Sequence, residues 1–281
     1  MGAAAATRVR RGFVHGPDGN IEYMEVGAGP PLVLLHGTPM SAMSYRHVAP
    51  LLGDAFRVVA MTTVGYGQSD RPEPPYTTLE EFARSVTWLM DGLGIERAHV
   101  DGNRTGSEFA ATLAAEYPER VDRLILEEIF NWSPPHRREA HERLHRYIEP
   151  RSDGGHLLEL WRKVGGDREG ADLARVSEHF MDNLIVNSNE GAAVYGGMGW
   201  EGAGPYAMTR HDIWETIPRI AAPTLVIHGT GSQLGRSHEK FVATLSNARG
   251  VRLPSVGNFY AQQAPELWAR EVRAFLTDPD V

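Results

Sequence analysis

Arg104 has the side chain whose type and position in the sequence most directly suggest chemistry. It lies between Gly102 and Gly106, in a short loop that joins an expected short strand at 98–101 to a helical pattern at 107–116. The free N–H groups and the dipole at a helix N-terminus favour a negative group there. A planar guanidinium adds two parallel hydrogen bonds to a carboxylate or enolate. We therefore predict an anion-binding site at Arg104.

An ion pair is the alternative role for Arg104, because a buried arginine needs a partner. Glu127 and Glu128 end an apolar run, at 123–128, and are the candidate partners. Burial would raise the pKa of Glu128 and suit its carboxyl group to proton transfer, whereas pairing with Arg104 would lower that pKa. The sequence leaves both roles for Glu128 open, general acid or base and structural partner.

The middle of the sequence contains histidines that could supply a base to such a site. His141 and His145 lie four residues apart on one helix face, a spacing that can bind a metal. Their arginine and glutamate neighbours, and the lack of a third ligand, favour a solvated face instead, so we expect no metal. His179 shares a helix face with Asp182 and Asn183. One of these histidines could act as a displaced base.

Aromatic residues in the same region predict an apolar cleft in which an aromatic substrate would bind. Core packing would explain most of these residues equally well. They are Trp132, Trp161, Phe180, Tyr195 and Trp200.

An alternation of short apolar runs and helical patterns must position these side chains. It predicts a mainly parallel sheet covered on both faces, with ligands at the carboxyl ends of the strands. Thr78 and Glu81 form a capping-box signature at the start of one helix. Strands are expected at 12–23 (in two pieces), 31–35, 57–61, 98–101, 123–128, 223–228 and 250–253, and helices at 42–52, 78–93, 107–116, 238–245 and 265–276.

The alternation stops between residues 131 and 216, where no strong strand signal occurs. An interruption between two halves of one α/β pattern indicates an insertion rather than a separate downstream domain. We therefore expect a helical cap at 132–215 inserted into a core formed by 1–131 and 216–281. The cap helices are expected at 138–148, 157–164 and 174–186, followed by a glycine-rich stretch at 191–204.

Composition excludes several classes of protein. The chain has 281 residues, a net charge of −8 and no cysteine, which excludes a disulfide scaffold, a thiolate metal site and a cysteine nucleophile. An acidic chain without a lysine or arginine run is a poor fit for nucleic acid. No apolar run reaches the roughly 20 residues of a membrane span. We expect a cytoplasmic protein that binds a small molecule and neither nucleic acid nor membrane.

Six motifs, in order and at similar spacing, make nearly the whole chain resemble the α/β-hydrolase superfamily, with the cap matching least. The nearest branch is that of the epoxide hydrolases and haloalkane dehalogenases. The resemblance implies an eight-stranded, mainly parallel sheet with an inserted helical cap, and a monomer or homodimer. The motifs are His36–Pro39, Gly65–Pro72, the turn Gly102–Gly106, Pro118–Val121, Pro223–Gly229 and Val256–Phe259.

Three catalytic positions depart from the family pattern. Arg104 stands where the family has its nucleophile, and a guanidinium has no lone pair with which to attack. Ser232 stands at the usual acid position, and Asn258 at the position of the histidine base. Glu128 falls where some dehalogenases carry their acid. The resemblance therefore implies the fold more strongly than the reaction.

The expected function is an enzyme without covalent catalysis or cofactor, acting on a small aromatic or polycyclic substrate such as a specialised metabolite. A non-hydrolytic step is expected: cyclisation, isomerisation, elimination or decarboxylation. Arg104 and the backbone N–H groups of Thr38 and Thr105 would hold an oxyanion or carboxylate. Glu128 would move a proton and Asn258 would orient the substrate. The other expected substrate contacts are Trp132, His179, Tyr195, Trp200 and Ser232.

Two alternatives stay open. One is an epoxide or ester hydrolase in which Glu128 and a cap histidine activate water, and solvent oxygen in the product would identify it. The other is a non-catalytic ligand-binding protein, which would bind its ligand tightly and release it unchanged.

Overall fold

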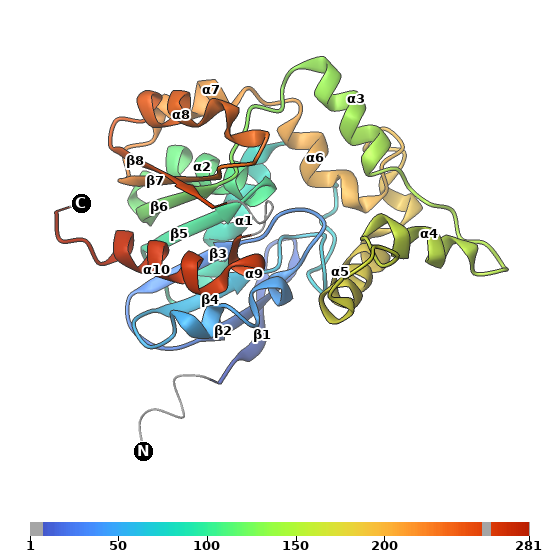
Figure 1. Cartoon of the computed structure of the whole chain (residues 1–281), viewed down its shortest axis with the longest axis horizontal. Coiled ribbons are helices and arrows are strands. Elements are labelled where there is room, and N and C mark those ends of the chain that lie inside the picture. Colours follow the sequence, from blue (N-terminus) through green and yellow to red (C-terminus); the bar gives the residue numbers. More distant parts are fainter. Residues whose placement is uncertain (1–7, 255–259, 281) are drawn as a thin grey trace.

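The computed structural model describes residues 8–254 and 260–280, and within them the strands form one eight-stranded sheet (Figure 1). The strands occur in the spatial order β1-β2-β4-β3-β5-β6-β7-β8. Only the β1–β2 and β2–β4 pairs are antiparallel, which confirms the predicted mainly parallel sheet. The bounds are β1 Arg10–Gly16, β2 Gly19–Val26, β3 Pro31–Leu35, β4 Arg57–Met61, β5 Ala98–Asn103, β6 Val121–Glu127, β7 Thr224–Gly229 and β8 Ala248–Leu253.

Alternate residues of each central strand face opposite sides of the sheet, and both sides are buried. In β3, Val33 and Leu35 join the apolar cluster that contains α1 (Leu79–Gly92), α2 (Thr105–Glu116), α7 (Ile213–Thr216) and α8 (His238–Thr244). Leu32 and Leu34 join the cluster that contains α9 (Tyr260–Gln263) and α10 (Pro265–Leu276). Burial on both faces explains why these strands are continuous apolar runs rather than alternating ones.

Helix α1 begins at the capping box that the sequence predicts. The Thr78 hydroxyl accepts a hydrogen bond from the Glu81 N–H, and the Glu81 carboxylate accepts one from the Thr78 N–H. This reciprocal pair satisfies two N–H groups that have no partner inside the helix.

The helix expected at 42–52 is wrong. The structure has two short 3₁₀ turns there, η1 (Ala42–Tyr45) and η2 (Ala49–Leu51). Pro50 lacks an N–H group and cannot donate within a continuous α-helix. The Tyr45 hydroxyl instead donates to the Leu35 carbonyl, which ties the first turn to the end of β3.

The chain between β6 and β7 contributes helices and no sheet strand in the described residues. Helices α3 to α6 of this stretch, coloured from green to light orange, lie to one side of the sheet in Figure 1. No helix in the described part of the chain is long and apolar enough to cross a membrane. The bounds are α3 Pro135–Leu144, α4 Gly155–Lys163, α5 Leu173–Val186 and α6 Ala203–Met208, with short 3₁₀ turns η4 Asn189–Gly191 and η5 Trp200–Gly202.

Candidate functional site

The turn between β5 and α2 presents Arg104 in a strained backbone conformation, with φ 53° and ψ −112°. The flanking glycines allow the close approaches that this turn requires. A Cβ on Gly102 would lie 2.2 Å from the Gly106 carbonyl oxygen, and one on Gly106 would lie 2.1 Å from the Leu35 carbonyl oxygen. The Arg104 N–H donates to the Glu127 carbonyl at 2.8 Å, which fixes the turn against β6.

The Arg104 side chain lines a cavity of about 280 Å³, together with Thr38 and Thr105. Burial lowers the pKa of Arg104, while the nearby Glu128 carboxylate raises it. A guanidinium has so high an ordinary pKa that it stays charged at neutral pH. Arg104 therefore contributes a fixed positive charge to this cavity, which we call the inner cavity.

Thr38 and Thr105 lie beside Arg104, as an anion site would require. A Cβ on Gly37 would lie 3.3 Å from the Arg104 Cβ, so the loop after β3 passes close to the turn. Thr105 is the first residue of α2, where N–H groups have no partner within the helix. Gly204 of α6 closes over both threonines, since a Cβ there would lie 2.8 Å from Thr105 Cγ2 and 3.1 Å from Thr38 Oγ1.

Glu128 lies behind the inner cavity rather than in it. Its side chain is fully buried, and its carboxylate accepts hydrogen bonds from the Gly229 N–H at 2.8 Å and from the Ser232 hydroxyl. Neither Glu128 nor Ser232 is among the residues that line the inner cavity. The expected substrate contact of Ser232 is thus corrected: its hydroxyl is directed to the buried carboxylate.

Glu127 takes part in a separate buried network. The Trp268 indole N–H and the Asn103 amide, at 3.0 Å, donate to its carboxylate. Burial raises the pKa of Glu127 to about 7, although these two donors act in the opposite direction. Burial and the charge of Glu127 also raise the pKa of Asp101 well above its ordinary value.

His141 and His145 lie in the inner cavity wall, which corrects the expected solvated face. Their exposed fractions are 6% and 7%, and their rings stack with centroids 5.2 Å apart and planes within 6°. The Trp132 ring meets His141 edge-on at 4.7 Å. This aromatic contact buries a helix face whose neighbours in sequence are mostly charged.

A carboxylate–imidazole pair forms in the same wall. His145 Nδ1 lies 2.5 Å from Glu201 Oε1, and Lys163 Nζ donates to Glu201 Oε2 at 2.5 Å. Burial alone would raise the pKa of Glu201, but His145 and Lys163 outweigh it and hold the pKa below the ordinary value. Glu201 is therefore a carboxylate that can orient the His145 ring and leave Nε2 for proton exchange.

His141 is an uncharged imidazole at neutral pH. Burial, followed by the charges of His145, Arg104 and Arg137, lowers its pKa to about 3. Its Nδ1 and the Trp132 Nε1 are both buried without a hydrogen-bond partner in the described part of the chain. A donor and an acceptor on adjacent rings are thus available to a bound molecule or a water.

The other expected contacts divide into two groups. Trp132 and His179 line the inner cavity. Tyr195 and Trp200 do not, because they pack against each other in the main apolar cluster with ring centroids 5.7 Å apart. Their expected substrate contact is corrected, and core packing explains both. Asn258 lies outside the described residues.

Sequence reasoning missed Glu201 and Lys163. Glu201 follows Trp200 in a glycine-rich stretch that carries no motif, so no local signal marks it. The spacing of His141 and His145 did carry a signal, but their charged neighbours led to the wrong orientation. No group of three histidine, aspartate or glutamate residues that could hold a metal occurs among residues 8–254 and 260–280.

Comparison with known proteins places this geometry in context. Residues 30–148 match the family described as the alpha/beta hydrolase fold. Haloalkane dehalogenase 2 of Mycobacterium tuberculosis is 34% identical over 114 residues, 41% of this chain and 40% of that protein. A fluoroacetate dehalogenase of a Burkholderia species is 26% identical and covers 90% of this chain and 88% of its own.

A crystal structure of a hydrolase from Pseudomonas aeruginosa PA01 superposes with a TM-score of 0.77, at 24% identity, over 95% of this chain and 98% of that one. The alignment spans about two fifths of the length of the first curated relatives, whereas the structural likeness is nearly complete. The two named relatives are dehalogenases, and the similar crystal structure is that of a hydrolase. The family match over residues 30–148, the sheet order and the structural likeness show that the chain has the α/β-hydrolase fold.

Proposed function

We propose that this protein is an enzyme that binds a small carboxylate- or enolate-bearing substrate in the inner cavity and moves a proton on it. The reaction would be non-hydrolytic, such as an isomerisation, elimination, cyclisation or decarboxylation, with no covalent intermediate and no cofactor. Residues 132–215 would act as the cap over the core. The observation that carries the proposal is one cavity lined by Arg104 from the core and by the Glu201–His145 pair from the inserted segment.

Arg104 supplies the anion-binding half of this mechanism. Its guanidinium and the N-terminal N–H groups of α2 act on the same region, so negative charge developing there is stabilised. The backbone N–H groups of Thr38 and Thr105 would complete the anion site. The relative that covers 90% of this chain is named for fluoroacetate, itself a small carboxylate, which supports this substrate class.

His145 supplies the proton-transfer half. The Glu201 carboxylate at Nδ1 fixes the ring orientation and stabilises the imidazolium that forms when Nε2 takes a proton. A positioned base of this kind contributes about 10²–10⁴-fold in rate. Glu128, with both carboxylate oxygens already hydrogen-bonded, would position and balance Arg104 rather than move a proton.

Hydrolysis is the second candidate, because the two named relatives are dehalogenases and the similar crystal structure is that of a hydrolase. In that case His145 would activate a water instead of taking a proton from carbon. Arg104 cannot form the covalent intermediate that a nucleophile at its position would form. Water would therefore have to attack the substrate directly.

Proton exchange in D₂O tests the proposal. The protein would be incubated with a panel of aryl-substituted carboxylic acids and 1,3-dicarbonyl compounds, and loss of acidic C–H signals followed by NMR. We expect proton exchange to be faster than in buffer alone. The exchange rate should fall by about 10²-fold or more in His145→Ala and Glu201→Gln. It should fall by a comparable factor in Arg104→Ala. Asp153→Asn, an exposed change in the same segment, is the matched control.

A parallel incubation in H₂¹⁸O separates the candidates. Product free of ¹⁸O supports the non-hydrolytic proposal, whereas one ¹⁸O atom in the product assigns the hydrolase. Tight binding of a panel member that is recovered without exchange or turnover would assign the ligand-binding alternative. Unchanged exchange in Arg104→Ala would overturn the role of Arg104.

A further inference from the structure

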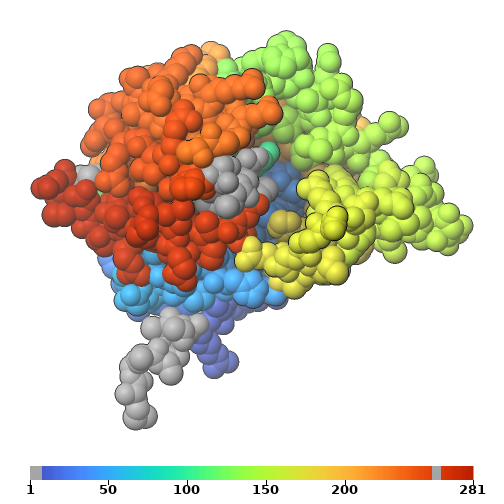
Figure 2. All heavy atoms as spheres, in the orientation of Figure 1, coloured from blue at the N-terminus to red at the C-terminus, as the bar shows by residue number. Residues whose placement is uncertain are grey.

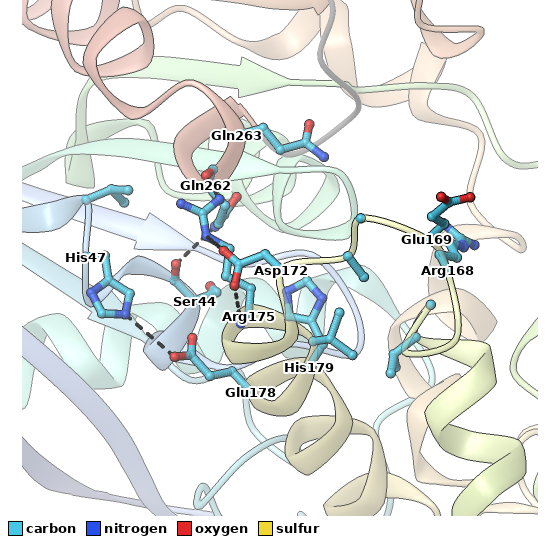
Figure 3. A pocket seen from close by; sticks show the side chains of 16 residues that line it. Ser44, His47, Arg168, Glu169, Asp172, Arg175, Glu178, His179, Gln262 and Gln263 are labelled. Atoms are coloured by element: carbon cyan, nitrogen blue, oxygen red, sulfur yellow. Dashed lines mark hydrogen bonds and ion pairs between the residues drawn. The ribbon is translucent and has the colours of Figure 1, made fainter.

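A second cavity, of about 370 Å³, lies beside the inner one and has no role in the proposed proton transfer. We call it the outer cavity. Its walls come from the loop before α5, from the first turns of α5, and from η1 and α9 of the core (Figure 3). In Figure 2 the surface is hollowed between the yellow atoms around α5 and the red C-terminal atoms, with blue atoms visible in the hollow.

The two cavities share three wall residues. Val164, Arg168 and His179 line both of them, so the cavities meet at this neck. Arg168 is exposed and forms no ion pair within the described ranges, which leaves its guanidinium available to a ligand group that passes the neck. A molecule held at Arg104 would leave the inner cavity between these side chains.

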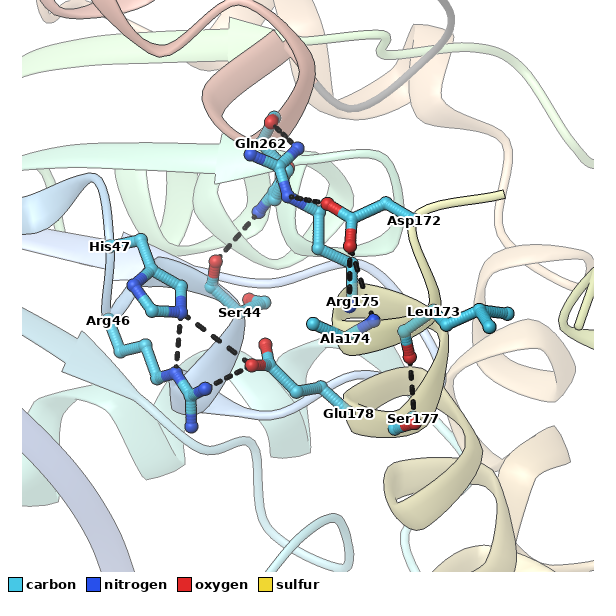
Figure 4. A network of polar contacts seen from close by, with 10 residues as sticks. All are labelled: Ser44, Arg46, His47, Asp172, Leu173, Ala174, Arg175, Ser177, Glu178 and Gln262. Atoms are coloured by element: carbon cyan, nitrogen blue, oxygen red, sulfur yellow. Dashed lines mark hydrogen bonds and ion pairs between the residues drawn. The ribbon is translucent and has the colours of Figure 1, made fainter. Parts of the chain in front are cut away.

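Polar side chains make up much of the outer cavity wall, and polar contacts hold them in place (Figure 4). Glu178 pairs with Arg46 and lies 3.6 Å from His47, while Arg175 pairs with Asp172 at 3.3 Å. The Gln262 side chain donates to the Ser44 carbonyl at 3.1 Å. Glu178 and Asp172 are already ion-paired, and the neighbouring wall residues Arg168 and Glu169 carry opposite charges, so the cavity favours neutral hydrogen-bonding groups over a second strong charge.

The inner cavity wall is mixed, like that of the outer cavity, but it carries the anion site at Arg104. Apolar side chains of Met40, Trp132, Leu144 and Met208 lie in the same wall. An aromatic or other flat apolar group suits this side of the inner cavity. The head and the tail of one molecule would therefore meet different groups in the two cavities.

We propose that the outer cavity binds the tail of the substrate, so that the substrate is an aryl carboxylate carrying a neutral, hydroxyl- or amide-rich tail. The carboxylate and ring occupy the inner cavity, and the tail crosses the neck beside Val164 and His179. This inference rests on the proposed function for its carboxylate head. The outer cavity itself is the basis for the proposed length of the substrate and for the polarity of its tail.

Binding of three probes by calorimetry tests the tail site: benzoate, 4-(glucosyloxy)benzoate and 4-cyclohexyloxybenzoate. We expect the glucosyl probe to bind at least 10-fold more tightly than benzoate, and the cyclohexyl probe to show no such gain. Ala171→Trp, which fills part of the outer cavity, should remove the gain of the glucosyl probe and leave benzoate binding unchanged. Leu158→Trp, on the exposed face of α4 outside both cavities, is the matched control.

His47→Ala and Gln263→Ala give an independent test, because these residues line the outer cavity alone. Each variant should bind the glucosyl probe several-fold more weakly and bind benzoate with unchanged affinity. The tail site would be overturned if benzoate and the glucosyl probe bound with equal affinity. It would also be overturned if these variants lost equal affinity for both probes. Failure of benzoate to bind at all, or benzoate binding unaffected by Arg104→Ala, would instead count against the proposed function.

Discussion

Arg104 and Glu128 both adopt positive φ angles, 53° and 55°, which cost non-glycine residues about 1–3 kcal/mol each. Each follows the carboxyl end of a central strand, β5 or β6. Their backbone N–H groups donate to Glu127 and Ile227 at 2.8 Å and 2.9 Å, so the neighbouring strands hold them in place. The fold thus holds a strained turn around a residue that cannot act as a nucleophile.

The buried carboxyl groups behind this turn predict a pH-dependent stability. The pKa of Asp101 is raised by burial and by Glu127, and that of Glu127 is raised by burial to about 7. The folded protein keeps protons on these two groups that the unfolded chain releases near pH 4, so their contribution to the free energy of unfolding falls as pH rises from about 4 to 7 and above.

Asp101→Asn should make this fall shallower, and raise the free energy of unfolding at pH 8 by about 1–2 kcal/mol, because one buried charge is removed. Urea unfolding at pH 5 and pH 8 measures it. Glu119→Gln, an exposed change, should leave the pH dependence as it is. The prediction would be contradicted if the free energy of unfolding changed between pH 5 and pH 8 by the same amount in Asp101→Asn as in the unchanged protein.

Part of the site could be predicted from the sequence, because it depends on local rules. Arg104 lies between two glycines, in the turn that joins a short strand to a helix. This local pattern predicts the turn and the anion-binding helix end beside it. Glu201 and its contact with His145 could not be predicted in this way, since 56 residues separate them and packing alone brings them together. The burial of His141 could not be predicted either, because its contact with the covering Trp132 ring is also made by tertiary packing.

At the scale of elements, the strands and long helices follow from pattern, and the loop at 42–52 does not. Buried apolar runs leave a central strand few alternatives, and α10 begins and ends at the residues that the sequence predicts. In the 42–52 segment, helical spacing competes with Pro50 and with the hydrogen bond from Tyr45 to β3. Tertiary contacts decide short segments of this kind.

The capping box of α1 predicts a measurable loss of stability. Thr78→Ala removes the hydroxyl that accepts the Glu81 N–H, and should lower the free energy of unfolding by about 1 kcal/mol. The urea midpoint should fall with an unchanged slope. Thr78→Ser keeps the hydroxyl, so its urea midpoint should stay close to that of the unchanged protein. Benzoate binding should be the same in both variants. Equal midpoints for the alanine and serine variants would show that the cap contributes nothing.

At the scale of the whole molecule, the segment between β6 and β7 is held to the rest of the chain by apolar packing and by polar contacts. Arg71 is central among them: it donates to the Ser188 hydroxyl and the Ile185 carbonyl, each at 3.1 Å, and pairs with Glu190. Its guanidinium also lies 5.1 Å from the centre of the Trp200 ring. One core residue therefore fixes the end of α5 and the turn that carries Glu201.

Arg71→Ala should loosen this attachment without unfolding the core. Loss of the charged hydrogen bonds should lower the local opening free energy by about 1–2 kcal/mol, which is about a 5–30-fold rise in amide exchange across residues 185–202. Hydrogen–deuterium exchange by mass spectrometry measures it, and exchange in β5 and β6 should stay slow. Because the same turn places Glu201 beside His145, proton exchange on the substrate should fall too.

Arg151→Ala is the control for this change, because both ion-pair partners of Arg151, Asp153 and Glu159, belong to the inserted segment itself. It should leave exchange across 185–202 unchanged. Arg71→Lys keeps the charge but loses the planar fork that reaches several acceptors, so its exchange should lie between those of the alanine variant and the unchanged protein. Uniformly faster exchange in Arg71→Ala, with β5 and β6 affected as strongly as 185–202, would show that the inserted segment and the core open as one unit rather than at this attachment.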